Sequence, residues 1–110
     1  MTARAAAPLG WPFEILVAMT NTLTLTDGAT NLVYGSSGLS GGKTLTLPSI
    51  QGAMVPSQNA FIIVANKSDS GGTITVAAAS GDSIIGTATV AAGAIATTFR
   101  HDALHQWFAT

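Results

Sequence analysis

The side chains best suited to chemistry lie near the C-terminal end of the chain, where His101, Asp102 and His105 are close together in sequence. Imidazole and carboxylate groups at this spacing could bind a metal ion or supply a general base. A metal site needs a third or fourth ligand, and the chain contains no cysteine that could provide one. We therefore interpret the cluster as polar residues of a link between strands or of a subunit contact. We expect no catalytic, metal-binding or cofactor-binding residue.

A glycine-rich stretch ending in Lys43 and Thr44 approaches the pattern of a phosphate-binding loop. The pattern G-x-x-x-x-G-K-[ST] requires glycine at position 37, where this chain has Ser37. It also requires a helix after the lysine, whereas residues 43–47 alternate between polar and apolar side chains as a strand does. We interpret the stretch as a connection between strands and expect no small-molecule substrate.

Composition limits the partners that the chain can have. Only 8% of the 110 residues are charged, against about 25% in an average domain. The four cations are scattered, so no basic patch is available for nucleic acid. The apolar fraction of 47% contains much alanine, which buries little area. A weak solitary core without disulfides favours oligomerisation as an additional source of stability.

These residues must be positioned by strands, because period-2 alternation dominates the sequence. Residues 22–26, 43–47 and 73–77 alternate threonine with apolar residues, and residues 60–66 form the most apolar run, which we expect to be central. Further strands are expected at 30–34, 83–85, 88–90, 94–99 and 106–109, separated by glycine-containing turns. The fold class is therefore all-β, a β-sandwich or jelly-roll-like domain.

The first residues differ from the rest of the chain. Two prolines and a glycine interrupt residues 1–12, and the apolar run 13–19 is either a first strand or a segment that docks on a partner. We expect an N-terminal arm over residues 1–20 and the β-domain over residues 21–110. No run reaches the ~18 apolar residues of a membrane span. The candidate residues for capsid or subunit contact are Trp11, Phe13, Ile15, Leu16, Val17 and Met19.

From Lys43 onward the chain resembles a module of tailed-phage structural proteins. The resemblance rests on the order of KTLTLPS, AFIIVANKSDSGGTITVAAASGDSIIG, VAAGAIATTF and a tryptophan near the end, with RHDALHQ departing from the usual short turn. It implies a bacteriophage head fibre or capsid decoration (cement) protein that is not an enzyme. It further implies a homotrimer that binds the major capsid protein at the virion surface after assembly in the host cytoplasm.

Two other functions remain open. One is a fibre or tail-tip module that contacts a host surface, although the chain has neither repeats nor a long shaft. The other is a carbohydrate-binding β-sandwich, which would place exposed aromatic rings in line on one face. We expect Phe61 and Phe99 in the core.

Overall fold

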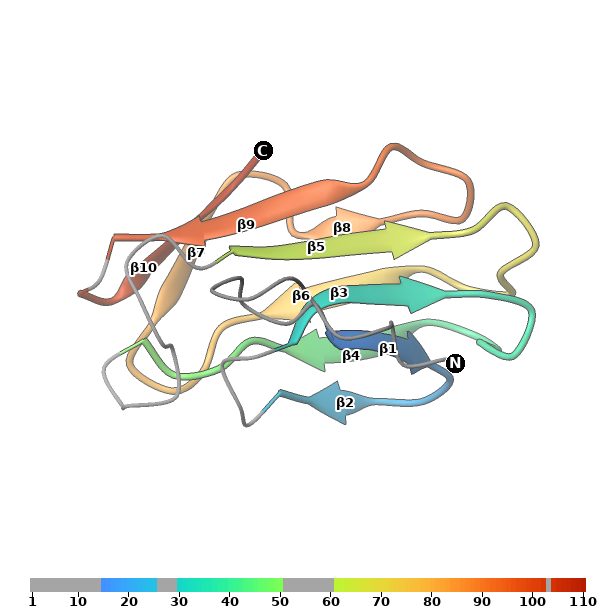
Figure 1. Ribbon diagram of the computed structural model, residues 1–110, viewed down its shortest axis with the longest axis horizontal. Helices are drawn as coiled ribbons and strands as arrows, with labels where there is room; N and C mark the ends of the chain where they lie inside the picture. Colours follow the sequence, from blue (N-terminus) through green and yellow to red (C-terminus); the bar gives the residue numbers. More distant parts are fainter. Residues whose placement is uncertain (1–14, 26–29, 51–60, 103) are drawn as a thin grey trace, which may run out of the picture.

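The computed structural model describes residues 15–25, 30–50, 61–102 and 104–110, and these ranges form two β-sheets with no helix (Figure 1). Sheet A has six strands, in spatial order β1 (Ile15–Met19), β3 (Thr30–Gly35), β5 (Phe61–Asn66), β9 (Thr97–His101), β10 (Gln106–Ala109) and β7 (Ser83–Ile85). Sheet B has four, in the order β2 (Leu23–Thr24), β4 (Lys43–Thr46), β6 (Ile74–Ala77) and β8 (Thr89–Val90). The all-β prediction is confirmed.

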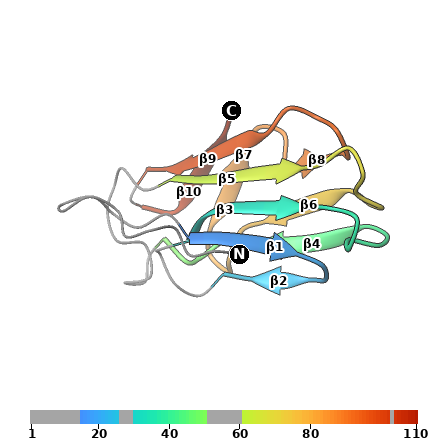
Figure 2. The same cartoon turned by 45° about the vertical axis from the view of Figure 1, so that its right-hand side comes forward.

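Up to β9 the chain passes from one sheet to the other at each successive strand, and only β10 folds back beside the strand that precedes it. Strands β1, β3 and β5 are parallel neighbours in sheet A, and β2, β4 and β6 are parallel neighbours in sheet B. Each pair β1–β2, β3–β4 and β5–β6 is therefore one coil, and the coils are stacked side by side (Figures 1 and 2). This winding differs from the antiparallel Greek keys of a jelly roll.

The second and third coils share one uninterrupted register. Residues paired between them are 31 apart in sequence, from Gly35 with Asn66 in sheet A, through the bridge between Ser40 and Gly71, to Leu45 with Val76 in sheet B. Between the first two coils the offset changes from 16 to 22, because the connection after β1 is shorter. Such constant spacing defines a structural repeat.

Close contact between two loops maintains this register. The N–H of Gly41 donates to the carbonyl of Gly71 (3.2 Å), and the N–H of Gly71 donates to the carbonyl of Leu39 (2.8 Å). A Cβ on Gly72 would overlap the carbonyl group of Gly41. The loops 36–42 and 67–73 therefore need glycine where their backbones meet.

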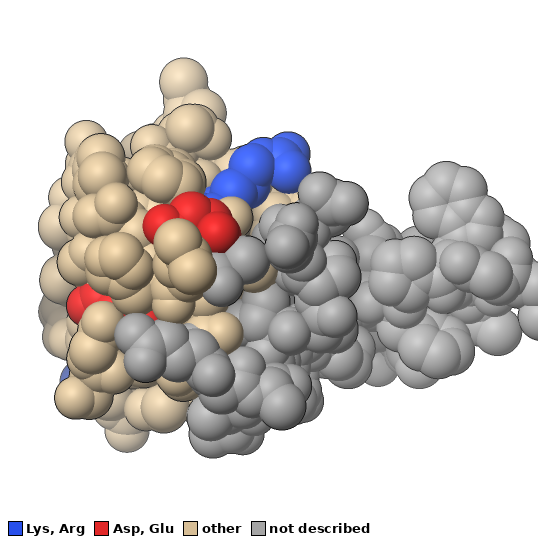
Figure 3. All heavy atoms as spheres, turned by 90° about the vertical axis from the view of Figure 1, so that its left-hand side faces the viewer, with Lys and Arg blue, Asp and Glu red and all other residues tan. Residues whose placement is uncertain are grey.

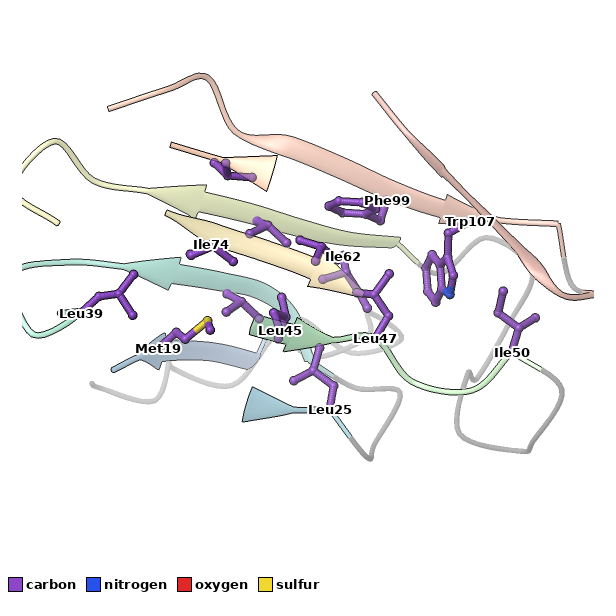
Figure 4. Close-up of a cluster of buried hydrophobic side chains, with 14 residues drawn as sticks. Met19, Leu25, Leu39, Leu45, Leu47, Ile50, Ile62, Ile74, Phe99 and Trp107 are labelled. Carbon is purple, nitrogen blue, oxygen red and sulfur yellow. The ribbon is translucent and has the colours of Figure 1, made fainter. Parts of the chain in front are cut away.

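Both sheets contribute to a single core (Figure 4). Leu45 and Leu47 are fully buried while Thr44 and Thr46 are only partly buried on the other side of the strand, which confirms the predicted alternation. The buried apolar residues are Met19, Leu25, Val33, Leu39, Leu45, Leu47, Ile50, Ile62, Val64, Ile74, Val76, Val90, Phe99 and Trp107. The burial of Phe99 was expected.

Two expectations need adjustment, and a third is confirmed. Residues 15–19, assigned to the N-terminal arm, form strand β1 of sheet A, and residues 1–14 lie outside the described ranges. The strand expected over residues 94–99 is instead Thr97–His101, because residues 94–96 belong to an exposed loop. Strand β5 is central in sheet A, between β3 and β9, as predicted.

Candidate protein-binding surface

The outer face of sheet A is unusually apolar. Strand alternation places Ile62, Val64 and Phe99 in the core, so their neighbours along the strands point outward. We name as the apolar face the outward-pointing residues Ala18, Leu32, Tyr34, Phe61, Ile63, Ala65, Ile85 and Phe108. Arg100 is the one charged residue that the described strands add to this face.

One cross-strand row forms the most distinctive part of this face. Phe61 pairs with Arg100, Arg100 with Phe108, and Phe108 with Ile85, so the row crosses β5, β9, β10 and β7. The Arg100 guanidinium carbon lies 5.1 Å from the centroid of the Phe61 ring, a cation–π distance. Ile85 and Phe108 remain 50% and 39% exposed. An arginine between apolar and aromatic side chains resembles the centre of a protein interface.

The outer face of sheet B is different. Its paired outward residues are mostly threonines, with Thr44 beside Thr75 and Thr75 beside Thr89, and the small Ala77 lies beside Thr46. Threonine hydroxyls form hydrogen bonds with water, so this face is an ordinary solvated surface of a sheet. The contrast between the two faces shows that the apolar face is not a general consequence of the composition of the chain.

A second apolar surface lies at one end of the molecule, in the loop between β8 and β9. All six residues from Ala91 to Ala96 are exposed, and Ile95 is 92% exposed. The loop is nevertheless held in place, since the N–H of Gly93 donates to the carbonyl of Asn66 (2.9 Å) and the N–H of Ala94 donates to that of Ala91 (3.0 Å). Gly93 adopts φ 77°, a conformation that favours glycine.

The contact residues predicted from sequence are only partly described. Trp11 and Phe13 lie outside the described residues. Ile15 and Leu16 belong to β1, but their side chains are not among those described. Val17 packs partly buried against the core, and Met19 is 1% exposed within it. The side chains of these last two residues therefore serve packing inside the chain rather than an exposed contact.

The structure separates the His–Asp cluster. His101 is buried and meets Trp107 edge-on, with ring centroids 5.2 Å apart, whereas His105 is exposed. Asp102 organises the turn before β10. Its Oδ1 accepts hydrogen bonds from the N–H groups of Leu104 (2.8 Å), His105 (3.0 Å) and Gln106 (3.0 Å). The pKa of Asp102 lies below its ordinary value of 3.8. The main cause is the hydrogen bond from the N–H of Leu104. The N–H groups of Gln106 and His105 and the nearby His105 side chain lower it further.

The other candidate chemistry is also accounted for by structure. Lys43 begins strand β4, so the glycine-rich stretch leads into a strand and not into the helix that a phosphate-binding loop needs. Among the described residues, no three His, Cys, Asp or Glu side chains are grouped so that they could hold a metal ion. Nor do these residues form a helix capable of crossing a bilayer.

The expectation that Phe61 lies in the core was wrong, because its side chain is on the outer face of sheet A and only partly buried. A signal for this was present in residues 60–65, which are apolar at every position. A continuous apolar run marks a strand that is covered on both faces. This continuous apolar run was thus a cue to the apolar face that alternation alone did not show.

Comparison with known proteins adds no relative. The chain matches no family model, no curated protein and no solved structure.

Proposed function

We propose that the protein is a non-enzymatic structural protein of a tailed-phage virion, a decoration protein that binds the assembled capsid as a homotrimer. The observation that carries the proposal is the apolar face of the six-stranded sheet. The described strands add a single charged residue, Arg100, to this face. Large exposed apolar surfaces on soluble proteins mark protein–protein contacts. The resemblance to phage structural modules from Lys43 onward supports the assignment to a virion.

The low charge of the chain supports the same class of function. Only 8% of the residues are charged, and a view along the strands shows few charged side chains on the described surface (Figure 3). A protein that spends its functional life packed against other subunits needs little surface charge for solubility. Such a protein stabilises a capsid by mass action, because it binds the assembled lattice and not the free subunits.

Co-sedimentation with undecorated heads of the phage that carries the chain tests this function. We expect the wild type to sediment with the heads, and Phe108→Asp, which places a carboxylate in the apolar face, to remain in the supernatant. Thr75→Asp makes the same change on the exposed outer face of sheet B and should bind as the wild type does. A wild-type protein that stays in the supernatant at every concentration would contradict the decoration function.

One observation favours a second candidate, the carbohydrate-binding module. Tyr34, Phe61 and Phe108 all belong to the apolar face, so aromatic rings do occur on one side of the molecule. Their polar neighbours on the described strands are Thr98, Arg100 and the pair Gln106–Ser83, in which Gln106 Nε2 already donates to Ser83 Oγ (3.1 Å). Sugar sites need hydrogen-bond partners for the hydroxyl groups. A glycan array probed with the wild type distinguishes the candidates, since specific hits that Phe61→Ala abolishes would favour carbohydrate binding.

A further inference from the structure

We propose that the partner of the apolar face is a second copy of this chain, which contacts it through the loop between β8 and β9. This inference rests on the proposed function only in taking the apolar face as a protein-binding surface. We name as the loop knob the exposed residues 91–96 together with the neighbouring turn 67–70. The contact joins two different surfaces, so each subunit uses its apolar face once and its loop knob once.

The apolar face is poorly suited to pairing with itself. Arg100 is exposed, and its described contacts are the Phe61 ring and its strand neighbours. The described strands of sheet A contain no Asp or Glu. Asp102, two residues beyond Arg100, uses its Oδ1 to accept hydrogen bonds from three backbone N–H groups of the following turn. Two such faces packed together would remove two guanidinium groups from water without an anion between them, and burying an unpaired charge is costly. The face therefore requires a partner surface that brings a carboxylate.

The loop knob has the complementary features. Ile95 is 92% exposed and its neighbours are small and uncharged, so the loop can approach a flat sheet closely. Hydrogen bonds from Gly93 to Asn66 and from Ala94 to Ala91 fix its shape before contact, which reduces the entropy lost on binding. An isoleucine held in this exposed position is explained by a partner that covers it.

The loop knob also supplies a carboxylate. Ser68 lies against the loop, since a Cβ on Gly93 would be 3.6 Å from its side chain, and the next residue, Asp69, is exposed. When Ile95 packs on the apolar face of another copy, Asp69 is the acid available to pair with Arg100. Lys67 is exposed on the same turn and must face solvent at the rim of such a contact.

The loop knob and the row of the apolar face lie too far apart in one subunit to contact each other, so the contact must join two subunits. The loop precedes β9 at one end of sheet A, whereas Arg100 and Phe108 lie toward the other end, where β9 leads into β10 (Figure 1). A subunit therefore cannot place its own loop knob on its own row. Contacts between unlike surfaces repeat from subunit to subunit and form a closed ring when the rotation closes, and a three-membered ring is the homotrimer of the proposed function.

Complementation between two variants tests the contact. Ile95→Asp disables the loop knob and Phe108→Asp disables the apolar face, and each variant alone should be monomeric by light scattering after size exclusion. An equimolar mixture retains one intact contact between unlike variants and should give twice the monomer mass of 11.1 kDa. Thr75→Asp, on the outer face of sheet B, should keep the wild-type mass. Circular dichroism of each variant checks that the fold is retained.

A charge exchange tests the predicted ion pair. Arg100→Asp and Asp69→Arg should each shift the native mass toward the monomer, and the double variant should restore it. A wild-type monomer at all concentrations, or a mixture of the two disabled variants that stays monomeric, would overturn the inference. Because Phe108→Asp is expected to lose both self-association and head binding, the decoration function is judged on head binding by the wild type, which is measured separately from the native mass. A monomer that still binds heads would leave the decoration function in place, and a ring that binds no heads would remove it.

Discussion

Asn66 shows how a single side chain joins the two sheets. It is 3% exposed at the end of β5, and its Nδ2 donates to the carbonyls of Gly72 (2.7 Å) and Val90 (2.9 Å). The amide thus links the loop 67–73 to the end of β8. Its Oδ1 has no hydrogen-bond partner, so the amide stabilises the fold through the two hydrogen bonds that its Nδ2 donates.

We expect Asn66→Ala to lower the free energy of unfolding by about 1–3 kcal/mol, because a buried carbonyl and a partly buried one lose their donor. Asn66→Asp should cost more, since it directs a carboxylate at the same carbonyls. Urea denaturation of the two variants and the wild type provides the comparison. Equal losses for both substitutions would show that the two hydrogen bonds are not what the amide contributes.

The turn at Asp102 makes a prediction about acid stability. Hydrogen bonds from backbone N–H groups, that of Leu104 first, lower the pKa of this carboxyl in the folded chain below its ordinary value of 3.8. The stabilisation is therefore present above pH 3.8 and is lost as the pH falls through the lower pKa of the folded state. Asp102→Asn, which keeps the shape and removes the titration, should flatten the dependence of the thermal midpoint on pH in this acidic range. The same acidic slope in both proteins would contradict this assignment.

At the scale of elements, the stacked loops 36–42 and 67–73 depend on close backbone approach. A Cβ on Gly72 would overlap the Gly41 carbonyl, whereas a Cβ on Gly42 would meet only the Thr73 carbonyl at 3.8 Å. We expect Gly72→Ala to cost about 1–3 kcal/mol of stability through this crowding. Gly42→Ala is the matched control and should be nearly neutral. Thermal denaturation of both variants provides the measurement, and similar midpoints would argue against tight stacking.

The sequence predicted most strands but not how they are connected. Alternation in residues 43–47 and 73–77 identified β4 and β6, because one side of each strand faces the core. Parallel neighbours 31 residues apart left only a weak trace, since Val33 with Val64 and Thr44 with Thr75 are the only identical pairs between these strands. The start of β9 was misplaced for a related reason. Residues 94–96 are apolar, as the residues of a buried strand would be, yet they belong to the exposed loop knob.

For the whole molecule, sheet position determines which parts open most readily. Strands β5 and β9 have neighbours on both sides, whereas β1 and β7 end sheet A and β2 and β8 end sheet B. We expect amide hydrogen exchange to be slowest in β5 and β9 and fastest in the four end strands, because end strands open without disrupting the rest of a sheet. Uniform protection across each sheet would indicate that the end strands are covered by partners.

The proposed binding surface was the least predictable feature at this scale. The sequence candidates clustered before residue 20, yet Met19 lies in the core, and the apolar face is assembled from strands that are distant in sequence. Phe61, Arg100 and Phe108 become neighbours only through the pairing of β5, β9 and β10. No local pattern reports such a row, because strand order is a property of the whole chain.

The constant register between the second and third coils has an evolutionary and engineering consequence. A unit of 31 residues begins and ends in equivalent positions, so duplicating it would add one rung to each sheet while leaving both ends of the protein unchanged. The length of the molecule could therefore grow by whole rungs through genetic duplication. Proteins lengthened in this way would have more strands in each sheet and the same surfaces at their ends.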